Sequence, residues 1–177
     1  MKAVTEDDML EMLRSATLVA AAVVTGLFAG LFYTFAVSVM IGLQRVDDRT
    51  FVSAMQQINV GILNGWFFAS FFGAPVLVAL AAVLHLNAGD KRALLWLVAG
   101  FVLVVATLII TIGINVPLND ALAAAGEPDR IADLAAVRAQ FESAWVRWNV
   151  ARAITSTAAL ACLSWALVRY RRVSAAA

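Results

Sequence analysis

The stretch ALLWLVAGFVLVVATLIITIGINV, residues 93–116, decides the fold class of this chain. It contains no charged residue, and about twenty apolar residues in a helix span the hydrocarbon core of a bilayer. Three similar stretches lie at residues 16–43, 63–86 and 150–168. Their hydropathy is continuous, whereas the strands of a membrane β-barrel alternate. The sequence therefore predicts an all-α protein, a bundle of four transmembrane helices that forms a single membrane domain over residues 1–177.

The composition supports this prediction and excludes several classes of protein. Of the 177 residues, 63% are hydrophobic and 14% are charged, which is far from the balance of a soluble domain. The acidic residues ahead of the first apolar stretch and the length of that stretch favour a retained helix over a cleaved signal. The net charge of +1 provides no basic stripe for nucleic acid. We expect membrane lipids as partners and no nucleic acid.

The small number of cysteine and histidine residues limits the kinds of metal site. Cys162 and His85 are the single residues of their types, which excludes a disulfide framework and any zinc or haem site built from several such ligands. A mixed Asp, Asn and His site remains as an alternative, but His85 and Asp120 fall at opposite ends of the predicted bundle. We therefore expect no metal and no cofactor.

The distribution of basic residues predicts the orientation in the membrane. With four crossings, both termini and the second loop share one side, and that side carries Lys2, Arg14, Lys91, Arg92, Arg169, Arg171 and Arg172, seven basic residues. The opposite side carries six, namely Arg45, Arg49, Arg130, Arg138, Arg147 and Arg152. Because cytoplasmic loops carry an excess of Lys and Arg, we expect a multi-pass protein of the cell membrane with cytoplasmic N and C termini.

Two further helices are predicted outside the spans. Phe51, Met55, Ile58 and Ile62 recur at helical spacing with polar residues between them, which indicates an amphipathic interfacial helix over residues 50–62, between the first and second spans. Pro128 is a good first helical residue, and no helix breaker follows it. One helix of about forty residues, or about 60 Å, is therefore expected, with an extension over 128–149 that stands outside the bilayer.

The third span ends in the sequence NVPLND, residues 115–120, where Lys, Arg, Trp or Tyr would be usual. Pro117 disfavours helical geometry at Val116, so we expect the helix to end or bend there, before a loop over 121–128. Antiparallel threading brings further polar and aromatic residues to this end of the bundle. They are Tyr33, Thr34, Asn59, Asn64, Trp66, Asn115, Asn119, Asp120, Trp145, Trp148, Asn149 and Arg152. Arg152 stands out, because an arginine at membrane depth needs a partner or a wet cavity.

Structural roles are alternatives for several of these residues. The tryptophans also fit an interfacial aromatic belt, and Asn115 and Asn149 also fit hydrogen bonds that hold helices together. Gly26 and Gly30 have the G-x-x-x-G spacing, which suits close packing inside the bundle or a homo-oligomer.

Four sequence boxes resemble the DUF1772, or anthrone oxygenase-like, family of membrane proteins. They are GLFYTF (30–35), DDRTFV with MQQIN (47–59), NVPLND (115–120) and W-x-x-WN-x-x-R (145–152). The resemblance covers residues 20 to 165, and Ile41 departs from it where the family favours proline. The resemblance implies oxidation of an anthrone or a related phenol to a quinone. A deprotonated anthrone can itself give an electron to O₂, so this reaction has no obligatory cofactor.

The reaction implied by this resemblance suggests roles for the polar residues. Arg152, Asn115 and Asn149 would stabilise the oxyanion, and Asp120 would take the proton. Substrate contacts are expected from Trp145, Trp148, Trp66, Asn119, Asn64, Asn59 and Tyr33. Two alternatives remain open: a non-catalytic protein that binds a small aromatic, quinone or lipid-like ligand, and a structural membrane partner.

Overall fold

The structure of the chain is a computed structural model that describes residues 5–87 and 91–174, with side chains as far as Tyr170. Lys2 and the side chains of Arg171 and Arg172, which contribute to the predicted sidedness, lie outside the described residues. None of the described residues forms a strand, and the predicted all-α class is confirmed. The elements in chain order are α1 (Glu6–Thr34), η1 (Phe35–Val39), α2 (Met40–Leu43), α3 (Asp48–Gly61), α4 (Gly65–Leu84), α5 (Lys91–Ile110), η2 (Thr111–Asn115), α6 (Val116–Ala124), η3 (Pro128–Arg130) and α7 (Leu134–Ser174).

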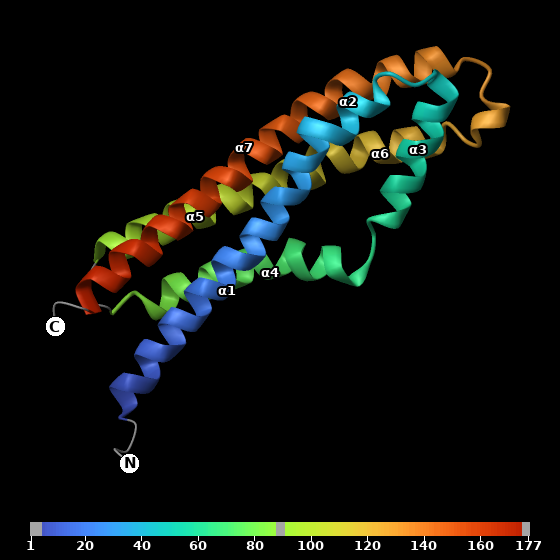
Figure 1. Cartoon of the computed structure of the whole chain (residues 1–177). Helices are drawn as coiled ribbons and strands as arrows, with labels where there is room; N and C mark the ends of the chain where they lie inside the picture. The colour runs from blue at the N-terminus through green and yellow to red at the C-terminus, as the bar shows by residue number, and fades with distance from the viewer. Residues whose placement is uncertain (1–4, 88–90, 175–177) are drawn as a thin grey trace.

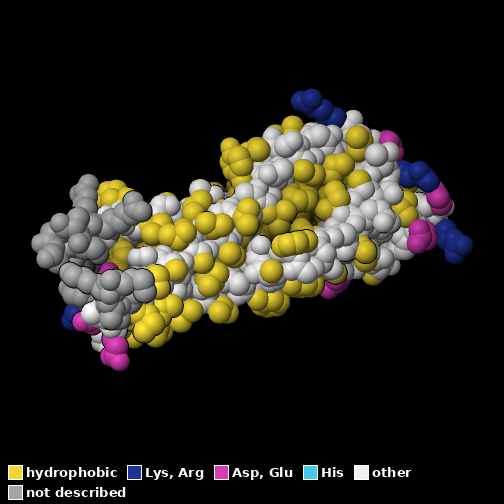
Figure 2. Space-filling model, turned by 60° about the horizontal axis from the view of Figure 1, so that its bottom comes forward, with side chains coloured by type: hydrophobic (Ala, Val, Ile, Leu, Met, Phe, Trp, Pro, Cys, Tyr) yellow, Lys and Arg dark blue, Asp and Glu magenta, His cyan; other side chains and the backbone are white. Residues whose placement is uncertain are grey.

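Within the residues that the structure describes, four continuous helical segments are long and apolar enough to cross a membrane. They are Glu6–Leu43, Gly65–Leu84, Lys91–Ala124 and Leu134–Tyr170. Hydrophobic side chains cover the middle of the molecule and most charged side chains gather at its two ends (Figure 2). Large side chains such as Leu27 and Val76 point outward, as the lipid-facing surface of a spanning helix requires. The chain is a multi-pass membrane protein with the predicted four-helix bundle.

The core of the bundle lies between α1, α4, α5 and α7, which run side by side with both termini at one end (Figure 1). Leu18, Phe28, Val78 and Leu163 are buried there. A Cβ atom added at Gly100 would lie 3.3 Å from the Leu163 side chain, so this glycine lets α5 and α7 approach closely. Apolar and small side chains therefore pack this half of the molecule tightly.

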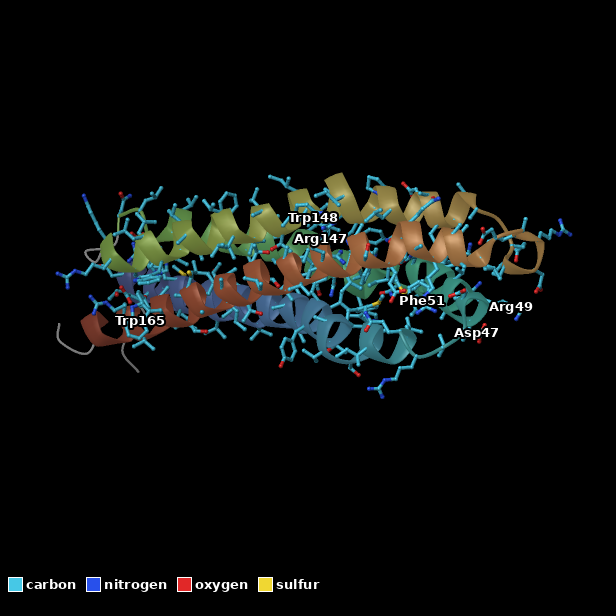
Figure 3. All side chains as sticks on the ribbon, turned by 90° about the horizontal axis from the view of Figure 1, so that it is seen from above. Asp47, Arg49, Phe51, Arg147, Trp148 and Trp165 are labelled. Carbon is cyan, nitrogen blue, oxygen red and sulfur yellow. The ribbon has the colours of Figure 1, made fainter. Side chains whose placement is uncertain are left out.

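The predicted amphipathic helix is α3, which packs across the other end of the bundle against α6 and α7. Its Phe51 and Met55 are fully buried in a second core with Leu122 and Phe141. Asp47 caps its start, because its carboxylate accepts from the Thr50 N–H at 3.0 Å. Asp47, Arg49 and Phe51 lie at the end of the molecule away from Trp165 (Figure 3).

A single arginine connects the start of α3 to α7. The Arg138 guanidinium pairs with Asp48 at 3.0 Å and with Glu142 at 2.6 Å, and it donates to the Val46 carbonyl at 2.8 Å. It also lies over the Phe51 ring, 4.4 Å from the ring centre. These contacts neutralise the charge of Arg138 and hold α3 in place over the end of the bundle.

Two element boundaries in the second half of the chain differ from the expected ones, and at the first of them only the expected helix end, not the alternative of a bend, is affected. The third long helix does not end at Val116. Its turn widens to a π-helix at η2, where the Val116 N–H donates to the Thr111 carbonyl, and this wide turn accommodates the Pro117 ring. The segment then stays helical to Ala124, so four of the eight residues expected in a loop over 121–128 are helical instead. The fourth long helix begins at Leu134 instead of Pro128, because Asp133 accepts from the Ala136 N–H at 2.9 Å.

Candidate functional site

A cavity of about 420 Å³ lies between the end of α1 with η1, the end of α3, the start of α4, the η2–α6 segment and α7. Its volume is in the range that suits a small-molecule ligand. Most of its wall is apolar, and its aromatic residues are Phe32, Phe35, Phe67, Phe68, Phe71, Phe72 and Trp145. The polar and charged side chains on the wall are Gln56, Asn59, Thr111, Asn115, Asn119, Asp120, Asn149 and Arg152. A mostly apolar cavity with a few convergent polar groups is the usual form of a ligand site.

Arg152 is the buried cation of this cavity, with a side chain from α7 that is 6% exposed. Its guanidinium carbon lies 4.4 Å from the centre of the Phe32 ring and 5.2 Å from that of Trp145. It donates to the Asn149 carboxamide oxygen at 3.0 Å. No carboxylate of the described residues forms an ion pair with it. A guanidinium desolvated in this way favours an anionic or oxygen-bearing ligand.

Two carboxamides lie beside Arg152 and have different surroundings. Asn149 donates to the Phe32 carbonyl at 3.1 Å and accepts from Arg152, so both ends of its side chain are engaged. Asn115 makes one long bond, from its NH₂ to the Trp145 carbonyl at 3.4 Å. Asn149 therefore holds Arg152 in position, whereas the oxygen of Asn115 is available to a ligand.

Three polar atoms on the cavity wall are buried without a hydrogen-bond partner among the described residues. They are Arg152 Nε, Asn115 Oδ1 and Asn59 Nδ2. Buried polar atoms are usually paired, and leaving one unpaired costs about 1–3 kcal/mol. Two of these atoms belong to donor groups and one is an acceptor. The two donors suit an oxyanion or carbonyl oxygen of a ligand, and the acceptor suits a ligand hydroxyl group.

Two π-helical turns contribute to the cavity wall. Phe35 belongs to η1, and Thr111, Ile112 and Asn115 belong to η2. A π-turn adds a residue to one helical turn and thereby changes which side chains face inward, and such turns occur frequently at functional sites. The π-turn that precedes Pro117 therefore determines that the fully buried Asn115 side chain faces the cavity.

Seven of the eleven sequence-predicted site residues line this cavity: Arg152, Asp120, Asn115, Asn149, Trp145, Asn119 and Asn59. The Trp145 indole N–H donates to Asn119 at 2.8 Å, which fixes the ring at the wall. Asp120 is exposed and belongs to the rim.

The other four predicted residues, Trp148, Trp66, Asn64 and Tyr33, are outside the cavity wall. Trp66 is 88% exposed at the start of α4, and Tyr33 points outward from α1. Asn64 caps α4, accepting from the N–H groups of Trp66 and Phe67 at 3.1 Å. Trp148 and the exposed Arg147 are neighbours on α7 (Figure 3).

The phenylalanines of the wall were missed in the sequence. Phe67 and Phe71 lie one turn apart on α4, and Phe32 and Phe35 lie one turn apart near the end of α1. Their spacing of three and four residues is the same as that of ordinary core or lipid-facing residues, so spacing alone could not identify them. A stronger signal was available in their position, because both pairs fall at the same level of the bundle as Arg152.

A second group of buried polar side chains lies near the chain termini. Arg14 Nε donates to the Leu84 carbonyl at 2.8 Å, and His85 Nδ1 lies 2.7 Å from the Ala81 carbonyl. The Tyr170 hydroxyl bonds to Glu11, and the Tyr170 ring contacts the His85 ring. None of these residues lines the cavity. Across the described ranges, no group of three His, Cys, Asp or Glu side chains is placed to hold a metal ion.

Comparison with known proteins gives one match. A family model described as anthrone oxygenase matches residues 66–162, which is more than half of the chain and extends from the first turn of α4 into α7. No curated protein and no solved structure matches the chain. The matched segment contains most of the polar residues of the cavity wall, whereas Phe32, Phe35, Gln56 and Asn59 lie before it.

Proposed function

Because the chain belongs to the anthrone oxygenase family, we propose that it is a membrane enzyme that oxidises an anthrone, or a related phenolic hydroquinone, to a quinone. The cavity beside Arg152 is the proposed active site. The observation that carries the proposal is the buried Arg152 guanidinium, which has no anionic partner among the described residues and faces an aromatic wall. Such a cation stabilises the oxyanion that forms when a phenolic substrate loses its proton.

The wall has side chains that suit a ring system with an oxygen at one edge. Phe32 and Trp145 hold Arg152 between them and extend as apolar surface into the cavity. Ring faces and edges of a bound tricycle pack favourably on such side chains. Arg152 Nε and the Asn115 oxygen supply a donor and an acceptor at the polar end.

The proposed reaction begins with proton removal. The CH₂ group opposite the anthrone carbonyl loses a proton to Asp120 or to water at the rim, and the negative charge moves to the carbonyl oxygen beside Arg152. The electron-rich anion gives one electron to O₂, and the resulting radical and superoxide combine to form a C–O bond. Protonation gives a hydroperoxide.

Quinone formation completes the reaction. The remaining hydrogen on the same carbon leaves as a proton while the O–O bond breaks, which forms the second carbonyl and releases hydroxide. The hydroxide takes up a proton to become water. In total, one anthrone and one O₂ give one quinone and one water, so the substrate supplies all the electrons and no further reductant is consumed.

A pair of arginine variants on the same helix tests this assignment. Arg152→Leu removes the buried cation, and Arg147→Leu removes an exposed one five residues away. Membranes with each variant are given an anthrone under air, and quinone formation is followed by absorbance against membranes without the protein. We expect at least a hundredfold loss for Arg152→Leu and wild-type activity for Arg147→Leu. Equal rates in wild type and Arg152→Leu would refute the proposed active site.

Binding without oxidation is the second candidate function, and the largely apolar wall favours it as much as it favours catalysis. Purified wild-type protein that binds the anthrone under argon but consumes no O₂ in air would support a binding protein for aromatic or quinone-like molecules. O₂ consumption equal to quinone formation would support the enzyme.

A further inference from the structure

One side of the cavity is formed by apolar side chains that are also exposed on the outer surface. Phe68 and Phe72 of α4 are 41% and 55% exposed, and Ile112 and Val116 of the η2–α6 segment are 57% and 41% exposed. All four line the cavity. The cavity therefore reaches the surface along the line where α4 faces η2–α6, and we refer to this opening as the lateral mouth.

The lateral mouth runs parallel to the helices. Ile112, Val116, Asp120 and Ala123 follow one another at spacings of three and four residues and all line the cavity, so they form a single stripe. From Ile112 to Asp120 this stripe extends over about 12 Å of helix. One end of the mouth is apolar, at Ile112 and Phe72. The other end, at Asp120 and Ala123, lies near the charged end of the molecule.

Nothing in the described part of the chain covers the apolar end of the mouth. The first turns of α4 diverge from α6, while the remainder of α4 packs on α1 and α5 (Figure 1). The surface is hollowed among hydrophobic side chains in the half of the molecule away from the termini (Figure 2). Phe72 and Ile112 belong to segments that are apolar enough to span the membrane, so the medium at this end of the mouth is lipid.

We infer that the substrate reaches the site from the bilayer, through the apolar end of the lateral mouth between Phe72 and Ile112, as an uncharged phenol dissolved in lipid. This inference rests on the proposed function, because Arg152 and Asn115 are taken as the groups that receive the oxygen end of the molecule. An anion would be excluded by the apolar end of the mouth. The substrate therefore enters neutral and loses its proton only after it reaches Arg152.

Two variants that narrow opposite ends of the mouth separate this route from access through water. Ile112→Trp narrows the lipid end, and Ala123→Trp narrows the end near Asp120. Ile109→Trp is the matched control, because Ile109 is 65% exposed one turn from Ile112 and does not line the cavity. Each variant is placed in vesicles under argon, and the association rate is followed by the ligand's own fluorescence. The probes are 1,8-dihydroxyanthrone and a water-soluble sulfonated derivative.

For 1,8-dihydroxyanthrone we expect Ile112→Trp to reduce the association rate at least tenfold and to have a clearly larger effect than Ala123→Trp. Ile109→Trp should leave the rate within twofold of wild type. Phe72→Ala, which widens the same end, should keep or increase the rate. The sulfonated anthrone should bind at least tenfold more slowly than 1,8-dihydroxyanthrone to the wild type. An equal effect of Ile112→Trp and Ala123→Trp, or an effect of Ala123→Trp alone, would overturn uptake from the bilayer.

The argon and air experiments have separable outcomes. Binding under argon with the expected pattern of variants, but no quinone in air, would support access from lipid and refute catalysis. Quinone formation in air with no effect of Ile112→Trp would support catalysis and refute this route. Absence of binding to the wild type would overturn both.

Discussion

Asn115 and Asn149 are carboxamides on the same cavity wall, but their hydrogen bonds differ. Asn149 donates to the Phe32 carbonyl at 3.1 Å, which joins α7 to the end of α1, and accepts from Arg152 at 3.0 Å. Asn115 makes one bond of 3.4 Å and leaves its oxygen without a partner among the described residues. Replacing a side chain that holds helices together lowers the stability of the protein. Replacing a side chain that binds the ligand lowers the affinity for that ligand instead.

We predict that Asn115→Leu weakens binding of an anthrone about tenfold, which corresponds to about 1.4 kcal/mol for one hydrogen bond, and leaves the melting temperature within a few degrees of wild type. Asn149→Leu should lower both the affinity for the anthrone and the melting temperature, since it leaves the Phe32 carbonyl and Arg152 without their partner. Titration under argon and thermal unfolding in detergent measure the two quantities. Loss of stability in Asn115→Leu with unchanged affinity would favour the structural alternative.

At the residue scale, most of the polar residues on the cavity wall were predicted from the sequence, but its phenylalanines were not. Antiparallel threading placed Arg152, Asn115 and Trp145 at one level of the bundle, because helix length and direction determine level. The direction of each side chain around its helix was harder to predict. Trp66 lies at the right level but on an exposed face, and η2 rotates the residues around Asn115 by an amount that no spacing rule reveals.

At the scale of one element, the start of α3 depends on an exposed acidic cap. The Thr50 hydroxyl and N–H both donate to the Asp47 carboxylate, and these bonds lower the pKa of that carboxyl below its ordinary value. The pKa of Asp47 is thus lower in the folded than in the unfolded chain. Its stabilising effect is therefore complete above the unfolded pKa of about 3.9 and is lost as the pH falls through the lowered folded value.

We predict that Asp47→Ala increases hydrogen exchange at the first amides of α3 at pH 7, and that this difference from wild type becomes smaller toward pH 2, to about the difference that a neutral oxygen cap gives. Asp47→Asn is the control, because it keeps an oxygen cap that does not titrate. Its exchange relative to the alanine variant should not depend on pH. Exchange measured by mass spectrometry on peptides from residues 44–61 provides the test. A difference between Asp47→Ala and wild type that is unchanged at pH 2 would contradict the role of the charge.

The helices themselves differ in how far the sequence determined them. The four apolar segments followed from continuous hydropathy, and α3 followed from its apolar spacing, because burial requires those patterns. The course of the chain after Val116 could not be predicted from these patterns. Pro117 is compatible with either a helix end or a wide turn, and packing of Leu122 in the core that α3 shares with α6 and α7 favours continued helix. Tertiary contacts decided between the two.

At the scale of the whole molecule, α7 is about twice as long as a bilayer core is thick, since its 41 residues extend over about 60 Å. We therefore predict that its first half, on which α3 and α6 pack, extends beyond the hydrocarbon. In this placement the cavity would lie at the boundary of the hydrocarbon, with Arg152 toward the bundle and Asp120 at the exposed rim. Such a position would give an apolar ligand access to lipid and the polar rim access to water.

The orientation of the protein in the membrane is a second property of the whole molecule. We predict that both termini are cytoplasmic and that the cavity rim lies on the outer side. In a Cys162→Ser background, Asn87→Cys lies in the turn after α4, and Ala124→Cys lies at the end of α6. Because one spanning segment separates these exposed positions, they fall on opposite sides of the membrane. In right-side-out vesicles, an impermeant maleimide should label Ala124→Cys at once and Asn87→Cys only after detergent is added. The reverse pattern would place the termini outside and the rim, with Asp120, in the cytoplasm.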